Sequence, residues 1–297
     1  MTSGVPLGNL SLPHDCTMTQ PIGIFDSGIG GLSILKALRA ELPHEDFVYI
    51  ADSGHAPYGE REDAHVTARS LAIAKYLVAQ NIKALVVACN TATAAAIDQL
   101  RADYPTLPII GVEPALKPAL QLSQTKHIAV MATRSTLASA RFAALLAAHN
   151  DQADFTLLAC DGLAEAIERS CQSPDATELI AACARIMGAT GLFGTGNKAK
   201  KRIDTLVLGC THYRFAAPYI KQYIAQHTCQ QTGLGVQLID TGAAVAQQTR
   251  LRLGRQLAAQ RNTATVQFIS TGSPAALEAA AKTWLGMTAD TKTLLIQ

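Results

Sequence analysis

Charged residues are scarce in this sequence, and the two signs nearly cancel. Only 16% of the 297 residues are charged, and 25 Lys and Arg against 23 Asp and Glu leave a formal net charge of +2. A protein that binds nucleic acid needs a concentrated basic surface to neutralise phosphates. The composition therefore argues against a nucleic-acid partner and favours a small molecule.

Long hydrophobic runs are also missing. The apolar runs are about five residues long, whereas a membrane-spanning helix needs about twenty apolar residues. Residues 1–20 lack the basic segment and apolar core of a secretory signal, so we expect them to form a loose N-terminal arm. These absences predict a cytoplasmic protein without a membrane segment.

Closely spaced cysteine pairs are a third absence. The chain has seven cysteines, an odd number, and none of them forms a C-x-x-C pair. We expect free thiols in a reducing compartment and no metal site, because structural zinc usually draws its ligands from close pairs. The cysteines are Cys16, Cys89, Cys160, Cys171, Cys183, Cys210 and Cys229.

Short β-branched runs alternate with longer segments of helical period. Strands that are apolar throughout and separated by helices indicate parallel sheets covered on both faces, so the predicted fold class is α/β. The expected strands are 22–25, 47–51, 84–88, 108–112, 127–131, 155–159, 205–209, 236–240 and 266–270. Expected helices include 31–42, 62–80, 92–102, 136–149 and 243–253.

The polar residues directly after these strands are the candidates for ligand binding, because parallel sheets bind ligands at the carboxyl ends of their strands. They are Asp26-Ser27-Gly28, Asp52-Ser53-Gly54, Cys89-Asn90-Thr91, Thr133 to Thr136, Cys210-Thr211-His212 and Asp240-Thr241-Gly242. Two pairs of segments echo each other, LVVACNT with LVLGCTH and IFDSG with LIDTG, which suggests a duplicated architecture. The segment 189–202 is glycine-rich and then basic, and we expect an exposed loop there.

The turn from Gly28 to Gly31 offers backbone N–H groups to an anion such as a carboxylate. A dinucleotide fingerprint would need a third glycine where Ser33 stands, although Asp52 does end the next strand. A nicotinamide-dependent oxidoreductase is therefore a weak alternative.

Two cysteines stand apart from the others. A single cysteine after a buried strand is usually a small hydrophobe. Cys89 and Cys210, however, each follow a different strand, and each precedes side chains that can hydrogen-bond a substrate. The other five cysteines lack this setting, and we interpret them as inert.

Two thiols suit the inversion of a stereocentre. One thiolate removes the α-proton from one face of an amino acid, and a thiol on the opposite face returns another proton. A hydrolase needs one nucleophile, which would leave the second cysteine unexplained. Asp26 and His212 are the candidate assistants, with a helix N-cap and a packing histidine as their structural alternatives.

At these residues the chain resembles the glutamate racemases of the aspartate/glutamate racemase superfamily. The matching motifs follow the family order from about Pro21 onward. They are FDSGIGGLSIL (25–35), ADSGHAPYGER (51–61), VVACNTAT (86–93), GVEPALKPA (111–119) and VLGCTHY (207–213).

The resemblance implies a role for each matching residue. Cys89 would act on D-glutamate beside Asp26, and Cys210 on L-glutamate beside His212. A family glutamate near the second thiol maps onto Glu168, with Glu165 as the alternative in a divergent segment. The implied substrate contacts are Asp26, Ser27, Tyr58, Gly59, Asn90, Thr91, Thr133, Thr136, Thr211 and His212.

The resemblance also implies the architecture and the partners. The fold would be two flavodoxin-like domains with parallel sheets and the active site in the cleft between them. Residues 21–113 and 231–297 would form the first domain and residues 114–230 the second. The family uses no cofactor and supplies D-glutamate for peptidoglycan, and some members are activated by a muramoyl-peptide precursor. The sequence leaves open whether the protein is a monomer or a homodimer.

Two alternatives share parts of this pattern. An aspartate racemase would use the same thiols on a substrate one methylene shorter, a difference worth about 1–3 kcal/mol of discrimination. His212 after Cys-Thr favours glutamate. A non-catalytic amino-acid-binding module would not need the second cysteine.

Overall fold

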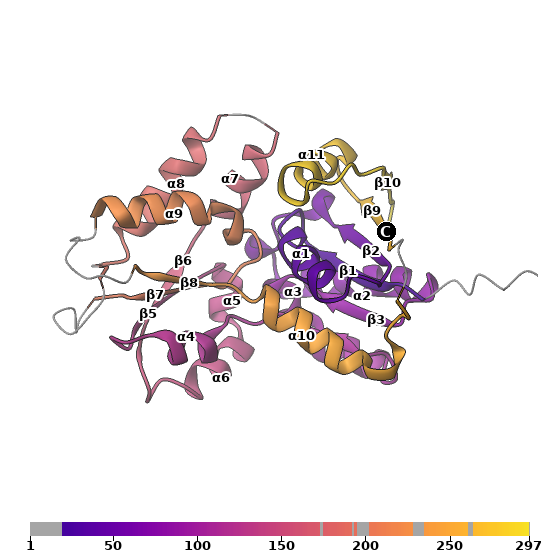
Figure 1. The fold of residues 1–297 in the computed structure, drawn as a ribbon, viewed down its shortest axis with the longest axis horizontal. Coiled ribbons are helices and arrows are strands. Elements are labelled where there is room, and N and C mark those ends of the chain that lie inside the picture. Colours follow the sequence, from indigo (N-terminus) through magenta and orange to yellow (C-terminus); the bar gives the residue numbers. More distant parts are fainter. Residues whose placement is uncertain are drawn as a thin grey trace, which may run out of the picture.

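The computed structural model describes residues 20–172, 175–191, 193–194, 202–227, 235–260 and 264–296. The predicted N-terminal arm up to residue 19, Cys16, Cys229 and most of the predicted 189–202 loop lie outside these residues. Two parallel sheets with helices on both faces form two α/β domains (Figure 1). The predicted fold class is confirmed.

The first domain is built on a six-stranded parallel sheet with the order β10-β9-β2-β1-β3-β4. Its central part, β2-β1-β3-β4, has the strand order of flavodoxin-like folds. The strands are β1 (Ile22–Asp26), β2 (Phe47–Ala51), β3 (Ala84–Val87), β4 (Ile109–Ile110), β9 (Val266–Ser270) and β10 (Thr291–Thr293).

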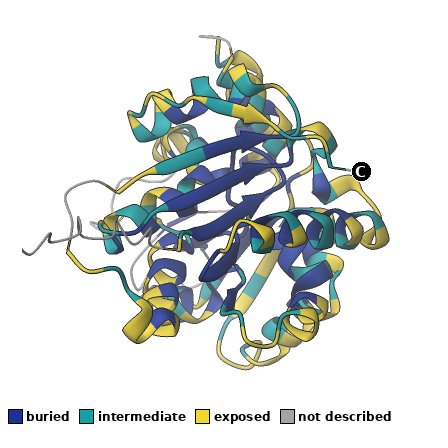
Figure 2. Cartoon of the chain, turned by 90° about the vertical axis from the view of Figure 1, so that its right-hand side faces the viewer, coloured by how far each residue is buried: buried dark blue, intermediate teal, exposed yellow. Residues whose placement is uncertain are grey.

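Side chains that alternate along the central strands supply two cores, one on each face of this sheet. Ile22 and Ile24 of β1 pack toward α1 (Leu32–Glu41), α10 (Gly242–Leu253) and α11 (Pro274–Leu285). Phe25 lies on the other face with α2 (Asp63–Ala79) and α3 (Asn90–Asp103). Figure 2 shows the central strands buried and the helices exposed on their outer sides. Burial on both faces explains why these strands are apolar without alternation.

The second domain is built on a four-stranded parallel sheet with the order β6-β5-β7-β8. Helices α7 to α9 cover one face, and α4 and α6 pack on the other (Figure 1). The strands are β5 (His127–Ala132), β6 (Asp154–Ala159), β7 (Thr205–Leu208) and β8 (Gln237–Ile239). The helices are α4 (Leu116–Leu122), α5 (Arg134–Ala138), α6 (Ala140–Ala147), α7 (Leu163–Ser170), α8 (Thr177–Gly188) and α9 (Tyr213–His227).

One of the two predicted echoes has a structural basis. β3 precedes the CNT segment and β7 precedes the CTH segment. In β2-β1-β3-β4 and in β6-β5-β7-β8, each of these two strands is the third strand of its domain along the chain and takes the third place in the order. The IFDSG and LIDTG segments do not correspond, because they lie on β1 and at the end of the edge strand β8.

One local expectation was wrong, and one strand was missed. The helix predicted over 136–149 is two helices, α5 and α6, separated at Ser139, whose hydroxyl caps α6 by accepting from the N–H of Phe142 at 3.1 Å. Strand β10 was not predicted, since Thr291–Thr293 carries no buried apolar residue. Two short 3₁₀ turns, Ser53–His55 and Tyr58–Glu60, follow β2.

The chain passes between the domains twice. It leaves the first sheet after β4, and it returns after β8 to place α10 against α1. The sequence puts these crossings near residues 113 and 230, and β8, which lies after 230, still pairs with β7. The exact boundaries stay predictions. Within the described residues, no helix combines the length and the apolar composition needed to cross a membrane.

Candidate active site

A cavity of about 270 Å³ lies between the carboxyl ends of the two sheets. Both domains line it, and both Cys89 and Cys210 face it. Of the residues named from the sequence, the lining includes Ser27, Tyr58, Gly59, Cys89, Asn90, Thr91, Thr133, Glu168, Cys210, Thr211 and His212. Of the catalytic and substrate-contact residues that the resemblance implies, Asp26 and Thr136 do not line it, and the alternative Glu165 does.

Cys89 is the N-cap of α3 in the first domain. Its sulfur accepts the N–H of Ala92 at 3.4 Å, and it lies 3.7 Å from the hydroxyl of Ser27. Burial, and next the negative charge of Asp26, raise the pKa of Cys89 to about 12. This thiol therefore holds its proton at neutral pH.

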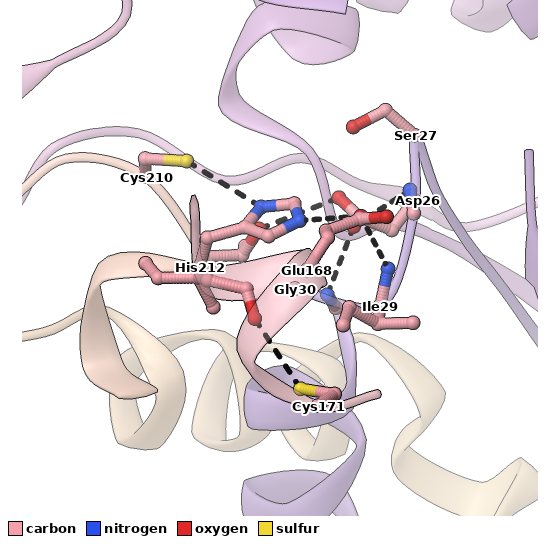
Figure 3. A network of polar contacts seen from close by, with 12 residues as sticks. Asp26, Ser27, Ile29, Gly30, Glu168, Cys171, Cys210 and His212 are labelled. Carbon is pink, nitrogen blue, oxygen red and sulfur yellow. Dashed lines mark hydrogen bonds and ion pairs between the residues drawn. The ribbon is translucent and has the colours of Figure 1, made fainter. Parts of the chain in front are cut away.

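Cys210 follows β7 in the second domain and is paired with an imidazole. Its sulfur lies 3.7 Å from Nδ1 of His212, and Nε2 of the same ring lies 2.8 Å from Oε1 of Glu168 (Figure 3). Burial alone would lower the pKa of His212, but the contacts with Cys210 and Glu168 raise it well above its ordinary value. Burial alone would raise the pKa of Glu168, and the hydrogen bond with His212 holds it below its ordinary value. An imidazolium and a carboxylate thus stand beside the second thiol.

The structure distinguishes Glu168 from Glu165. Both lie on α7, three residues apart, but Glu168 faces His212 while Glu165 forms an exposed ion pair with Arg169 at 2.5 Å. On a helix, residues three apart share a broad face, so the sequence alone does not separate them. Both residues line the cavity, but Glu168 is the one whose carboxylate contacts His212 beside the second thiol.

Asp26 lies behind the cavity wall and holds the turn that follows β1. Its Oδ2 accepts the N–H groups of Gly28 at 3.1 Å and Gly31 at 3.0 Å, and its Oδ1 lies 3.4 Å from the hydroxyl of Thr211. Burial raises the pKa of this carboxyl, against the lowering effect of His212 and of the two N–H groups. Asp26 is therefore both a turn-stabilising carboxylate and the charged group that most raises the pKa of Cys89.

Three N–H groups of this turn, those of Gly28, Ile29 and Gly31, already have partners within the chain. Besides the two that Asp26 takes, the N–H of Ile29 donates to Oε1 of Glu168 at 3.1 Å. For these three groups the expectation that they bind a ligand anion was wrong, because carboxylates of the protein accept them.

Three threonine hydroxyls form a cluster across the cleft. Thr91 from the first domain lies 3.0 Å from Thr133 and 3.4 Å from Thr136, both from the second domain. Thr133 is also the N-cap of α5, where it accepts the N–H of Thr136. Beside them, Gly59 packs so closely that a Cβ atom there would lie 2.7 Å from Cβ of Thr133. The cluster gives one wall of the cavity several hydroxyl donors.

Asn90 carries the least satisfied side chain at the cavity. It is buried, and neither its Oδ1 nor its Nδ2 has a hydrogen-bond partner within the described residues. Buried amides are normally paired, so an unpaired amide on a cavity wall points to a ligand that completes it.

Tyr58 shows a contact that the sequence did not predict. Its hydroxyl donates to Oδ2 of Asp52 at 2.5 Å, and burial together with this carboxylate raises the pKa of Tyr58 far above its ordinary range. Asp52 is in turn held by the guanidinium of Arg69 and the hydroxyl of Thr271. The Tyr58 hydroxyl is thus directed away from a substrate, and the pocket wall is fixed from behind.

Other lining residues carry no signal in the sequence. Cys160, interpreted as inert, also lines the cavity, and burial raises the pKa of its thiol to about 12. At the rim, Arg134 forms an ion pair with Asp161 at 2.5 Å. Among the described residues, no group of three or more His, Cys, Asp or Glu side chains is placed to hold a metal ion.

Two α/β domains that present one thiol each to a shared cleft, one of them beside an imidazole and a carboxylate, define an amino-acid racemase. The family model described as Asp/Glu/Hydantoin racemase matches residues 32–249. The chain belongs to this family and, within it, to the glutamate racemases, which are isomerases. The family and the enzyme class inferred from the sequence are confirmed.

Individual relatives agree with this assignment along most of the chain. The glutamate racemase of Ectopseudomonas mendocina is 42% identical over 90% of this chain and 95% of its own. That of Ralstonia nicotianae is 44% identical over 90% of each chain. Among solved structures, a Bacillus anthracis glutamate racemase matches with a TM-score of 0.76 and 28% identity, covering 93% of this chain and 97% of its own. An Escherichia coli glutamate racemase, solved with L-glutamate and the activator UDP-MurNAc-Ala, gives a TM-score of 0.76 and 26% identity over 94% and 99%.

Proposed function

We propose that this protein interconverts L- and D-glutamate by transferring protons between the substrate and two thiols, Cys89 and Cys210. The observation that carries the proposal is that these two sulfurs, which come from equivalent strands of different domains, face one cavity. A substrate held between two domains presents one face of its α-carbon to each.

In the direction from L- to D-glutamate, the thiolate of Cys210 takes the α-proton. The electron pair of the broken C–H bond stays on the α-carbon and spreads into the carboxylate. The thiol of Cys89 then gives its proton to the opposite face, a new C–H bond forms, and Cys89 is left as a thiolate. In the reverse direction the two cysteines exchange roles, and no other reactant is needed.

The protonation states around the two sulfurs suit this sequence of events. Glu168 keeps the imidazole of His212 protonated, so Nδ1 of an imidazolium faces the sulfur of Cys210 at 3.7 Å. Cys89 starts as a thiol, because burial and Asp26 raise its pKa to about 12. Its first step is therefore to donate a proton, and Asp26 is the nearby carboxylate that assists in the reverse direction.

Neutral donors on the cavity wall are suited to the substrate carboxylates. We assign substrate binding to Ser27, Asn90, Thr91, Thr133 and Thr211, with Gly59 and the ring of Tyr58 shaping the wall. Thr136 supports this set from behind through Thr91 and Thr133. Hydrogen bonds aimed at a carboxylate strengthen as negative charge develops on it, which lowers the barrier to α-proton removal.

The relatives support glutamate as the substrate and suggest the biological role. Curated relatives at about 42% identity are glutamate racemases, and a Francisella tularensis relative was solved in complex with D-glutamate. We propose that the product D-glutamate enters peptidoglycan synthesis. The Escherichia coli relative was solved with the activator UDP-MurNAc-Ala. We propose that a peptidoglycan precursor of this kind also activates the present protein.

Isotope incorporation tests the reaction. Purified protein incubated with L-glutamate in deuterated water should form D-glutamate that carries deuterium at the α-carbon. Cys89→Ser and Cys210→Ser should each abolish racemization. Cys171→Ser is the matched control, since Cys171 lies outside the cavity and donates to the carbonyl of Ile167, a hydrogen bond that serine retains.

Two results would contradict the proposal. A D-glutamate product that keeps the original α-proton would show that no solvent-exchanging thiol intervenes. Turnover of L-aspartate without turnover of L-glutamate, in parallel incubations, would assign the protein to the aspartate racemases of the same superfamily.

A further inference from the structure

The turn between β1 and α1 meets the second domain at its catalytic side chains. Oε1 of Glu168 accepts the N–H of Ile29 at 3.1 Å, and the hydroxyl of Ser33 donates to the carbonyl of Thr211 at 3.1 Å. Figure 3 shows Glu168 and His212 lying against the backbone from Asp26 to Gly30. Glu168 and His212, which lie beside Cys210, therefore contact the first domain, which carries Cys89.

Two glycines make this close approach feasible. A Cβ atom on Gly28 would lie 1.9 Å from Oε1 of Glu168, and one on Gly30 would lie 2.3 Å from Nδ1 of His212 and 2.6 Å from the hydroxyl of Thr211. Neither glycine has a positive φ of the kind that disfavours other residues. Glycine is required at both positions by volume and not by backbone conformation.

We propose that Gly28 and Gly30 are positioning residues that form a socket in the first domain, which seats Glu168 and His212 and so orients the imidazole toward Cys210. This inference rests on the proposed two-thiol reaction. It assigns to the turn a function in the chemistry of the opposite domain, across the cleft.

The hydrogen bonds explain how the socket works. Glu168 holds Nε2 of His212 with the same oxygen that accepts the N–H of Ile29, so the position of the first domain fixes the carboxylate and the carboxylate fixes the ring. The ring then presents Nδ1 to the sulfur of Cys210. A displacement of the carboxylate releases this whole chain of contacts.

The two positions differ in what a methyl group would displace. At Gly28 it meets the end of a flexible glutamate side chain, which swings away at small cost to folding but loses its contacts with Ile29 and His212. At Gly30 it meets an imidazole ring and a threonine, which have less freedom to move. We therefore expect Gly28→Ala to fold normally and lose activity, and Gly30→Ala to lose more.

The expected loss for Gly28→Ala is about a hundredfold in kcat/KM, the size associated with a misplacement of catalytic groups by about 1 Å. A racemase must have equal kcat/KM values in both directions, because the two enantiomers have equal free energy. Slower proton transfer at Cys210 therefore shows itself in the deuterium isotope effects on kcat/KM and not in a difference between the two kcat/KM values. From L-glutamate, removal of the α-hydrogen by Cys210 becomes the slow step; from D-glutamate, reprotonation by Cys210 becomes the slow step.

The experiment measures kcat/KM with α-deuterated L-glutamate and α-deuterated D-glutamate for the wild-type protein, Gly28→Ala and Gly30→Ala. The socket predicts that the isotope effect rises for the L-enantiomer and falls for the D-enantiomer. Gly235→Ala is the control, since no atom of the described residues lies within 4 Å of a Cβ atom there, and it should match the wild type. Thermal unfolding of each variant reports whether it is folded.

A second substitution, Glu168→Asp, tests whether the new methyl group acts by displacing the side chain of residue 168. Glu168→Asp shortens the side chain that the new methyl group would meet, so Gly28→Ala should cost several-fold less activity in the Glu168→Asp background than in the wild type. Loss of activity with both isotope effects unchanged, an opposite asymmetry, or equal costs in the two backgrounds would overturn the inference. A wild-type protein that incorporates no deuterium into glutamate would instead overturn the proposed function.

Discussion

The buried carboxylate of Asp52 makes hydrogen bonds whose contribution to the free energy of unfolding can be measured. Asp52 is fully buried and accepts four hydrogen bonds: from Nε and Nη2 of Arg69 at 3.0 and 2.9 Å, from Tyr58 at 2.5 Å and from Thr271 at 2.8 Å. Arg69 is only 6% exposed and also donates to the carbonyl of Ile296. The carboxylate thus joins the turn after β2, helix α2, the end of β9 and the C-terminal segment.

Removing one partner of a buried ion pair strands the other charge. We expect Asp52→Ala to lower the free energy of unfolding by about 3–5 kcal/mol, the range for breaking a buried pair. Replacing both partners by apolar groups of similar volume removes the stranded charge, so Asp52→Leu combined with Arg69→Met should recover most of the loss. Tyr58 also loses its anchor, and KM for glutamate should rise in both variants.

Urea unfolding followed by circular dichroism at neutral pH measures these changes. The pH dependence gives a second reading. Burial alone would raise the pKa of Asp52, but the hydrogen bonds from Arg69, Tyr58 and Thr271 hold it below its ordinary value. The contribution of Asp52 to the free energy of unfolding is therefore complete above the ordinary pKa of aspartate and is lost as pH falls through the lowered value. In Asp52→Ala, the free energy of unfolding should not show this decrease at acidic pH. A loss below about 1 kcal/mol, or a double variant no better than the single one, would refute the reasoning.

Three further predictions concern the cleft. Asn90→Ala should lower kcat/KM for glutamate about ten- to a hundredfold while leaving the unfolding midpoint unchanged, because the amide has no partner among the described residues; steady-state kinetics and thermal unfolding check this. His212 has a raised pKa and Glu168 a lowered one, so their pairing stabilises the protein most between the two ordinary values. That stabilisation should decline as pH rises through the raised pKa or falls through the lowered one; a flat difference between wild type and Glu168→Gln across pH would contradict it. Trp284, the single tryptophan, stacks on Phe215 of the other domain with ring centroids 3.4 Å apart. Phe215→Ala should therefore shift the fluorescence of Trp284 and lower the free energy of unfolding by about 0.5–1.5 kcal/mol beyond the loss of buried area. An unchanged emission spectrum would argue against the stack.

Much of the fold could be predicted because buried parallel strands leave a strong apolar signal. All nine strands expected from the sequence are present, and residues from the turns after β1, β2, β3, β5 and β7 line the cavity, whereas Asp240, Thr241 and Gly242 after β8 do not. Strand β10 escaped notice, since its edge position and the polar residues Thr291–Thr293 give no such signal. The break at Ser139 was missed because an apolar helical period continues on both sides of it.

The site was less predictable where it depends on long-range contacts. Sequence reasoning placed Asp26 and Glu168 near the thiols by resemblance, but it did not reveal that Asp26 stabilises the turn or that Glu168 reaches Ile29, which is 139 residues away along the chain. Asp52 and Tyr58 share one motif, but the motif does not indicate that Arg69 and Thr271 hold the same carboxylate. The contact of Glu168 with Ile29 arises from the docking of the two domains, and the contacts of Asp52 arise from packing within the first domain; local sequence patterns encode neither.

The order of strands in the larger sheet has a consequence for biosynthesis. β2 pairs with β1 on one side and with β9 on the other, and β9 follows the entire second domain in the chain. A nascent polypeptide therefore emerges from the ribosome with β2 as an open, apolar sheet edge, whereas the smaller sheet is already complete by Ile239. Translation thus delivers the thiol of Cys210 on a foldable domain before the domain that carries Cys89 can close its sheet.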